Sequence, residues 1–169
     1  TMSVERRNIL KAYGAEVVLT DGAKGMKGAI AKAEELAKEI PGSFIPGQFE
    51  NPANPEAHLM HTAVEILEQA GKPIHGFCCG IGTGGTISGI GKMLKSENPT
   101  TEIWAVEPEN AAILSGGAIG THLQMGIGDG LIPPVLDQDI YDEVCVITDK
   151  EALETARELA RREGLLVGI

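Results

Sequence analysis

The sequence predicts an α/β protein built on a parallel sheet. Apolar stretches of strand length alternate along the chain with amphipathic stretches of helix length, a pattern typical of parallel strands joined by right-handed helical crossovers. A glycine-rich loop at residues 80–86 stands between one of these strands and the next helix. The 169 residues are 43% hydrophobic and 22% charged, a composition typical of a globular protein with a sizeable core.

The first part of the chain predicts two helices separated by a short strand. Residues 3–13 have a helical pattern that Ser3 can cap at its N-terminus. The run of branched residues at 15–20 predicts a strand. An apolar stripe over residues 26–40 predicts an amphipathic helix, and residues 43–45 follow as a short extended segment.

Residues 46–55 are dense in proline, asparagine and glycine, so we expect them to lack regular structure and to form the crossing between two domains. Helices and strands then alternate around the glycine loop. We expect a helix at 58–71, a strand at 74–79, a helix at 86–96 and a strand at 102–107.

Residues 111–134 show little periodicity and many glycines, and long stretches of this kind inside a domain are usually functional loops. A strand is expected at 142–148 and a helix at 149–163, with Asp149 as the N-cap of the helix. The final apolar run at 164–169 resembles a strand that is cut short. We therefore expect the chain to be a fragment of a longer protein.

The net charge of the chain argues against some classes of binding partner. The formal net charge is −10, so there is no surplus of cations to bind a nucleic-acid backbone. No apolar run is long enough to span a bilayer, and no export signal begins the chain. We expect a cytoplasmic protein that binds neither nucleic acid nor membrane and whose partner is a small molecule.

The cysteines and histidines are expected to have structural roles. Cys78, Cys79 and Cys145 lie in apolar, strand-like runs, and free cysteine is among the most buried residue types, so we expect all three to fill the core. His58 and His61 lie three residues apart on one helix face but have no evident carboxylate partner for a metal ion. We expect a surface or capping role for them and predict no metal site.

The glycine loop is suited to an anion. Glycines allow close approach and positive φ, while the N–H groups and dipole at the start of the next helix attract negative charge. The spacing Gly80-x-Gly82-x-x-Gly85 also fits a dinucleotide-binding fingerprint, and Glu107 closes the next strand, where such folds hold a ribose hydroxyl. Spacing alone leaves open whether the loop holds a dinucleotide or one phosphate monoester, gripped with the help of the loop's two threonines.

Several separated motifs together resemble the cysteine synthase family, the O-acetylserine sulfhydrylases. The matching stretches are Gly-Ile-Gly-Thr-Gly-Gly-Thr-Ile-Ser-Gly at 80–89 and the segments 3–7, 48–55, 114–117 and 126–128. They occur in the family's order and cover essentially the whole chain. The resemblance therefore weights the phosphate monoester over the dinucleotide and implies the cofactor pyridoxal 5′-phosphate.

The resemblance also implies a fold. Members of this tryptophan synthase β-like group, called fold type II, have two domains, in which parallel sheets with helices on both faces form three layers. Residues 1–48 would be part of the smaller, substrate-gripping domain, and residues 49–169 would be most of the larger, phosphate-binding domain. The fold is expected to be incomplete in this chain.

The same resemblance assigns residues to a site. The cofactor phosphate would be held by Gly82, Thr83, Gly84, Gly85 and Thr86, and the substrate would contact Gln48, Gly126, Ile127 and Gly128. The side-chain amide of Gln48 would donate to the substrate carboxylate. No residue of this chain is assigned a catalytic role, because the family's Schiff-base lysine is expected before Thr1.

The implied activity is a β-replacement that makes L-cysteine from O-acetyl-L-serine and sulfide, with the cofactor as electron sink. The resemblance further implies a homodimer to which a serine acetyltransferase can dock. Without the lysine, the isolated chain is expected to show no turnover.

Three positions depart from the family pattern. Met125 stands in place of glutamine, Leu131 in place of phenylalanine and Ser88 in place of threonine. The first change removes a hydrogen-bonding group beside the substrate cleft, so it bears on the choice of substrate more than on the cofactor.

Three alternative functions stay open, the last of them a binding module, a catalytically silent relative that acts through partners. Residues 62–66 also resemble cystathionine β-synthase, a sister enzyme with the same chemistry on a different acceptor. A nicotinamide-dependent oxidoreductase is the second alternative, and it would use the dinucleotide fingerprint together with Glu107.

Overall fold

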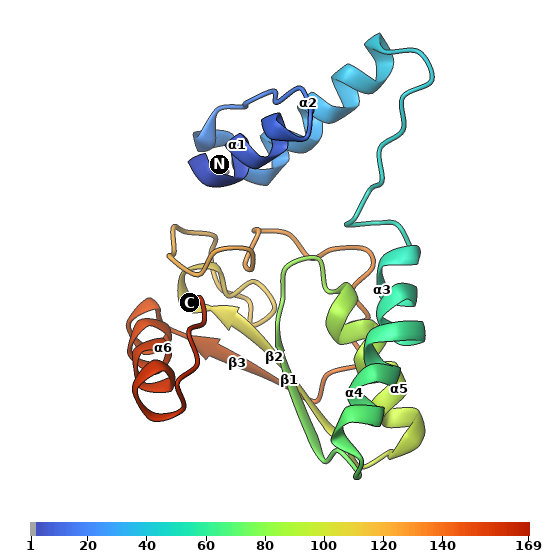
Figure 1. The fold of residues 1–169 in the computed structure, drawn as a ribbon, viewed down its shortest axis with the longest axis vertical. Coiled ribbons are helices and arrows are strands. Elements are labelled where there is room, and N and C mark those ends of the chain that lie inside the picture. The colour runs from blue at the N-terminus through green and yellow to red at the C-terminus, as the bar shows by residue number, and fades with distance from the viewer. Residues whose placement is uncertain (1–2) are drawn as a thin grey trace. The chain divides into compact units, whose positions relative to one another are not determined.

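The computed structural model describes residues 3–169, which belong to two compact units. One unit ends at Pro46 and the other is Gly47–Ile169. Figure 1 shows the helices and strands of each unit. The assignment of residues 1–48 to a substrate domain and 49–169 to a phosphate-binding domain concerns function and stays a prediction.

The N-terminal unit is helical in its regular parts. It contains α1 (Val4–Ala12), a short 3-10 turn named η1 (Gly22–Lys24) and α2 (Gly25–Glu39). Ser3 caps α1 as predicted, because its hydroxyl accepts from the backbone N–H of Arg6 at 3.3 Å. Both helices predicted for this part of the sequence are therefore confirmed.

Two predicted strands do not form. Residues 15–20 and 165–169 have no regular structure, although Gly164, with φ +70°, ends the preceding helix as expected. A strand needs a hydrogen-bonded neighbour, and sheet pairing among the described residues is confined to three strands elsewhere in the chain. Branched and apolar residues gave these segments a strand-like pattern, but the described residues supply no partner for them.

A continuous helical stretch precedes the sheet. It consists of α3 (Ala53–Ala57), a π-helical turn named η2 (His58–Thr62) and α4 (Ala63–Ala70). The helix begins well before its predicted start at residue 58. Prolines in the first turn of a helix need no N–H, and the side chain of Asn51 accepts from the Ala53 N–H at 3.0 Å. The proline-rich composition therefore marks a helix start as well as a turn.

The sheet has three parallel strands in the order β1-β2-β3: β1 (Gly76–Gly80), β2 (Glu102–Pro108) and β3 (Glu143–Ile147). Cys79 pairs with Ala105, and Ala105 pairs with Val144. The parallel arrangement predicted from alternating elements is confirmed. A short turn, η3 (Glu109–Ala111), follows β2 and begins the long glycine-rich loop.

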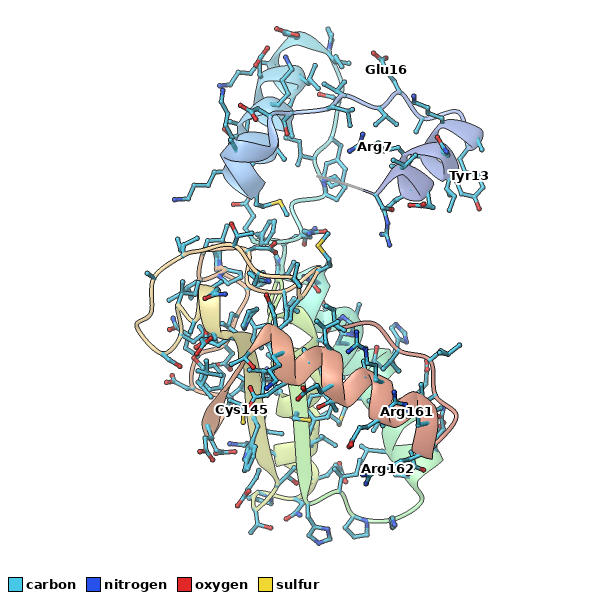
Figure 2. All side chains as sticks on the ribbon, turned by 90° about the vertical axis from the view of Figure 1, so that its left-hand side faces the viewer. Arg7, Tyr13, Glu16, Cys145, Arg161 and Arg162 are labelled. Atoms are coloured by element: carbon cyan, nitrogen blue, oxygen red, sulfur yellow. The ribbon has the colours of Figure 1, made fainter. Side chains whose placement is uncertain are left out.

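Helices lie on both faces of this sheet. On one face lies α5 (Gly85–Glu97), whose side chains Ile87, Ile90 and Leu94 form the core with Ile103 and Ala105 of β2. On the other face lies α6 (Asp149–Arg162), which Figure 1 shows across the sheet from α4 and α5 and which stands in front of the sheet in Figure 2. The predicted layers of helix, sheet and helix are therefore present.

The cysteines of β1 have different environments. Cys79 lies on the core side, and burial raises the pKa of its thiol to about 11, so this thiol stays protonated and unreactive near neutral pH. Cys78 is exposed, so the prediction that it fills the core is wrong. Its side chain points to the opposite face of the sheet, as adjacent residues on a strand must, beside Trp104 in the parallel register. Cys145 is half-buried.

The N-cap of α6 lies one residue earlier than predicted. The hydroxyl of Thr148 accepts from the Glu151 N–H at 3.1 Å, and the Glu151 carboxylate accepts from the Thr148 N–H at 2.9 Å. This reciprocal pair is a complete capping box. The carboxylate of Asp149, the predicted cap, accepts instead from the Leu123 N–H of the long loop at 3.0 Å.

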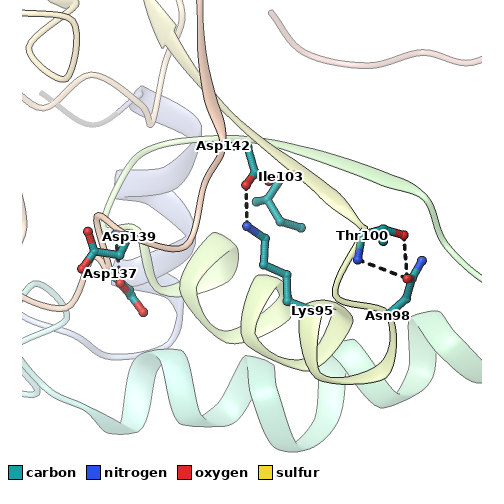
Figure 3. A network of polar contacts seen from close by, with 7 residues as sticks. All are labelled: Lys95, Asn98, Thr100, Ile103, Asp137, Asp139 and Asp142. Atoms are coloured by element: carbon teal, nitrogen blue, oxygen red, sulfur yellow. Dashed lines mark hydrogen bonds and ion pairs between the residues drawn. The ribbon is translucent and has the colours of Figure 1, made fainter.

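Asp142 joins three elements just ahead of β3, as Figure 3 shows. Its carboxylate accepts from the Lys95 ammonium of α5 at 2.6 Å and from the Ile103 N–H of β2 at 2.7 Å. The hydrogen bond from Lys95 and then that from Ile103 lower the pKa of Asp142 below its usual value. Asp142 therefore helps to fix the start of β3 beside β2.

We expect the Asp142→Asn variant to unfold at a lower temperature than wild type near neutral pH, by an amount that corresponds to no more than about 1 kcal/mol because the pair is partly exposed. A depressed native pKa contributes stability above the unfolded-state pKa of about 3.9 and loses it as the pH falls further. The difference in unfolding midpoint should therefore shrink below about pH 4. Glu143→Gln, an exposed neighbour, is the control, and an Asp142→Asn difference that persists at low pH would contradict the argument.

Candidate functional site

The glycine loop connects the end of β1 to the start of α5. Gly84 is the N-cap of α5, has φ +81° and offers no side chain to cap the first turn. Among the described residues, the backbone N–H groups of Thr86 and Ile87 have no acceptor. Free N–H groups and the positive end of the helix dipole favour an anion at this point. The local geometry is therefore that of an anion-binding loop.

Close packing around the loop also leaves no room for a side chain at several of its glycines. A Cβ atom on Gly82 would lie 2.5 Å from the Gly126 carbonyl oxygen, and one on Gly84 would lie 2.7 Å from the Leu136 Cβ. A Cβ atom on Gly85 would collide with the side chain of Asn54. The approach of an anion is therefore not the only reason for these glycines, because neighbouring segments of the protein already pack against the loop.

The predicted substrate residues Gly126, Ile127 and Gly128 lie against the glycine loop. The N–H of Gly128 donates to the carbonyl of Ile81 at 3.0 Å, and a Cβ on Gly80 would lie 3.1 Å from the Ile127 Cγ2. The structure thus brings together two glycine-rich segments that are far apart in the sequence. Their role in binding a substrate stays a prediction.

Asn54 links Gln48 to the glycine loop. The side-chain amide of Asn54 donates to the Gln48 carbonyl at 2.8 Å and to the Thr83 hydroxyl at 2.9 Å. In the sequence, Asn54 is only one residue of the motif at 48–55, with no predicted role. Its position after a helix-starting Asn-Pro pair was the available signal, but its two acceptors could not be read from the sequence.

Thr86 has a partner that the sequence argument also missed. Its hydroxyl lies 3.2 Å from the Nε2 atom of His58, and the Nδ1 atom of the same ring lies 3.0 Å from the Thr62 hydroxyl. His58 therefore contacts the predicted phosphate-binding residues, so the expectation of a surface or capping role for it is wrong. The π-helical turn places His58 and Thr62 next to α5.

Ser88 fixes the first turn of α5. Its buried hydroxyl donates to the Gly84 carbonyl at 2.7 Å and accepts from the Asp137 N–H at 2.9 Å. Both interactions need only a hydroxyl, so serine serves here in place of the threonine usual in the family pattern. Ser88 thus ties the loop's positive-φ glycine to the segment that follows the long loop.

Glu107 is buried, with 2% of its surface exposed. Its two carboxylate oxygens accept from the Leu114 N–H and the Ser115 N–H, each at 2.9 Å. A carboxylate closed off in this way is not placed to hold a ribose hydroxyl. This geometry disfavours the dinucleotide interpretation and makes Glu107 an anchor for the loop that follows β2.

His122 and Asp129 are titratable residues of the long glycine-rich loop and lie close to Gly128. Burial raises the pKa of Asp129, and the nearby His122 partly opposes that rise. The Nε2 atom of His122 lies 3.3 Å from the Gly128 carbonyl oxygen, and its buried Nδ1 has no partner among the described residues. Met125, which stands in place of the family's glutamine, is exposed.

Comparison with known proteins decides between the cofactors that an anion-binding loop can serve. The model of the pyridoxal-phosphate dependent enzymes matches residues 1–169. The chain belongs to this family. The predicted family is therefore confirmed, and the nicotinamide alternative is not favoured.

Individual pyridoxal-phosphate dependent relatives agree. A cysteine synthase of Staphylococcus aureus (strain Mu50 / ATCC 700699) is 55% identical over 170 residues, which cover 100% of this chain and 54% of that protein. The structure of a cysteine synthase (OASS) from Entamoeba histolytica is 42% identical with a TM-score of 0.89, over 98% of this chain and 49% of that one. An O-acetylserine dependent cystathionine β-synthase from Helicobacter pylori is 43% identical with a TM-score of 0.92, over 98% and 54%.

This family member spans about half the length of the curated relatives it matches. Its parallel sheet with helices on both faces agrees with the fold of the solved relatives. Across residues 3–169, every helix falls short of the length and apolar character that a bilayer crossing requires.

Proposed function

We propose that the protein carrying this chain is a cysteine synthase, which makes L-cysteine from O-acetyl-L-serine and sulfide with pyridoxal 5′-phosphate. The observation that carries the proposal is the uncapped start of α5 behind the glycine loop, set in a chain that is 55% identical to a cysteine synthase of Staphylococcus aureus. The cystathionine β-synthase alternative is not favoured by the curated relatives of Staphylococcus aureus and Bacillus subtilis, which are named cysteine synthase and probable cysteine synthase.

The residues at the loop fit a phosphate monoester. Gly82, Thr83, Gly84, Gly85 and Thr86 would hold the cofactor phosphate. The free N–H groups at the start of α5 supply donors, and the hydroxyls of Thr83 and Thr86 lie in the same turn. When bound, pyridoxal phosphate supplies an electron sink for the α-carbon of an amino acid. The role of this chain would be to anchor that cofactor by its phosphate end.

The segment Gly126–Gly128 and Gln48 would contact the amino-acid substrate. Backbone groups at Gly126 and Gly128, where φ is +89° and +66°, can approach a ligand closely because no Cβ is present. The side-chain amide of Gln48 would donate to the substrate carboxylate. Residues 1–48 would belong to the substrate domain, and residues 49–169 to the phosphate-binding domain. The catalytic lysine is expected outside residues 1–169, before Thr1.

The proposed assembly is a homodimer in the cytoplasm that a serine acetyltransferase can join. These parts of the proposal come from the resemblance to the cysteine synthases alone. Size measurement of the purified protein, with and without a serine acetyltransferase, would test them.

We expect the protein, expressed from its complete reading frame, to bind pyridoxal phosphate, to turn yellow and to form cysteine from O-acetylserine and sulfide. Thr86→Val should weaken cofactor binding roughly 10-fold or more, because a hydrogen bond to a charged phosphate is lost. Absorbance titration with pyridoxal phosphate measures the affinity. Thr155→Val, at an exposed position on α6, is the matched control. A colourless protein that makes no cysteine would contradict the proposal.

A further inference from the structure

We infer that Asn54 is a positioning residue that makes the Thr83 hydroxyl a hydrogen-bond donor toward the cofactor phosphate. The inference rests on the proposed function, because it concerns how the loop would grip pyridoxal phosphate. It adds a positioning residue from α3 to a site whose predicted phosphate contacts come from the loop and α5.

The contacts of Asn54 fix the orientation of its amide. The Gln48 carbonyl is only an acceptor, so the Asn54 atom that faces it at 2.8 Å must be the NH2 nitrogen. The same nitrogen faces the Thr83 oxygen at 2.9 Å. An NH2 group has two hydrogens, and these two contacts use both. Asn54 is therefore a donor to Thr83 and cannot accept from it through this atom.

The hydroxyl of Thr83 is then left with its hydrogen. A hydroxyl oxygen has two lone pairs and one hydrogen. One lone pair accepts from Asn54, and the second accepts a longer contact, 3.4 Å, from the N–H of Gly85. With both acceptor positions occupied, the remaining interaction of this hydroxyl is donation. A phosphate oxygen at the start of α5 is an acceptor that matches it.

Asn54 is held in place by its surroundings. Its backbone N–H donates to the Asn51 carbonyl at 3.0 Å in the turn that begins α3. Gly85 has no Cβ, and a Cβ atom there would occupy the space of the Asn54 side chain. The packing of α3 against α5 therefore sets the position of the amide before any ligand binds.

Aspartate at position 54 has nearly the same shape as asparagine but should reverse the hydrogen bond to Thr83 and lose the one to the Gln48 carbonyl, which only accepts. An ionised carboxylate only accepts hydrogen bonds, so Thr83 would donate to it and would present lone pairs to the phosphate. The new negative charge would also repel the phosphate. Asn54→Ala would remove the amide and leave the Thr83 hydroxyl free to rotate, which is a milder change.

The test compares cofactors with and without phosphate, on protein expressed from its complete reading frame. Affinities for pyridoxal phosphate and for pyridoxal are measured by absorbance titration, and the bound phosphate is observed by ³¹P NMR. Asn54→Asp should weaken pyridoxal phosphate binding roughly 10-fold or more, shift the ³¹P signal and leave pyridoxal binding unchanged. Asn8→Asp, which makes the same charge change at an exposed position on α1, should match wild type.

A double-mutant cycle separates action through Thr83 from a general loss of structure. Thr83→Val removes the hydroxyl, so adding Asn54→Ala to it should weaken phosphate binding no further. Equal losses for pyridoxal and pyridoxal phosphate, additive effects in the cycle, or a wild-type affinity in Asn54→Asp would each overturn the inference while leaving the proposed function intact. A wild-type protein that binds no pyridoxal phosphate would overturn the proposed function and the inference with it.

Discussion

Replacing Gly85 with alanine is expected to lower the free energy of unfolding by about 2 to 4 kcal/mol. The added methyl group would occupy the space of the Asn54 side chain, so Asn54 would have to give up its hydrogen bonds to Gln48 and Thr83. Alanine is a better helix former than glycine, but this preference recovers only about 1 kcal/mol. Denaturant-induced unfolding followed by circular dichroism measures the difference.

The same substitution should weaken pyridoxal phosphate binding, because the displaced amide no longer orients Thr83. Gly76→Ala is the control for a glycine with room around it, since the nearest atom to its Cβ would be the Glu102 carbonyl oxygen at 4.0 Å. Shortening Asn54 to alanine should relieve the collision, so Gly85→Ala should cost much less stability in the Asn54→Ala background. An equal cost in both backgrounds would refute the collision.

Replacing Glu107 with glutamine is expected to cost about 2 to 4 kcal/mol of unfolding free energy. The buried carboxylate accepts from the N–H groups of Leu114 and Ser115. Glutamine keeps the shape but has one acceptor oxygen, so its NH2 group would face one of these two donors. The buried donor would lose its partner, and the loop that follows β2 would lose one of its two attachments to Glu107.

Two measurements check the Glu107 prediction. The unfolding free energy should fall, and amide hydrogen exchange at Leu114 and Ser115 should speed up as the loop opens more often. Glu109→Gln, an exposed change two residues along the chain, should alter stability by less than about 0.5 kcal/mol. Unchanged exchange rates in Glu107→Gln would show that the carboxylate does not anchor this loop.

The positions of the strands and most helices could be predicted because their signals are local. The apolar runs that became β1, β2 and β3 alternate with amphipathic stretches, and this order alone indicates a parallel sheet. The same local signal failed at residues 15–20, where the pattern is strand-like but the described residues offer no neighbouring strand. It failed again at the start of α3. Prolines there predict a turn, but proline is also compatible with the first turn of a helix.

The candidate site likewise contains residues that could be predicted from the sequence and residues that could not. The glycine loop was found because its residues are contiguous and their backbone chemistry suits an anion. Asn54, His58 and the true role of Glu107 were missed, because each is defined by a partner distant along the chain or by a buried backbone contact. Thr83, for example, is 29 residues from Asn54. No pattern in a single sequence states which carbonyl or hydroxyl an amide will meet.

Local sequence patterns are enough to predict the α/β class, the position of the anion-binding loop and the resemblance to a family. The groups around that loop come together only in the folded chain: Asn54 donates to Thr83, His58 lies beside Thr86, and Ile127 and Gly126 pack against Gly80 and Gly82. Backbone propensity and side-chain periodicity act over a few residues, whereas hydrogen-bond direction and steric room arise only when distant segments pack together.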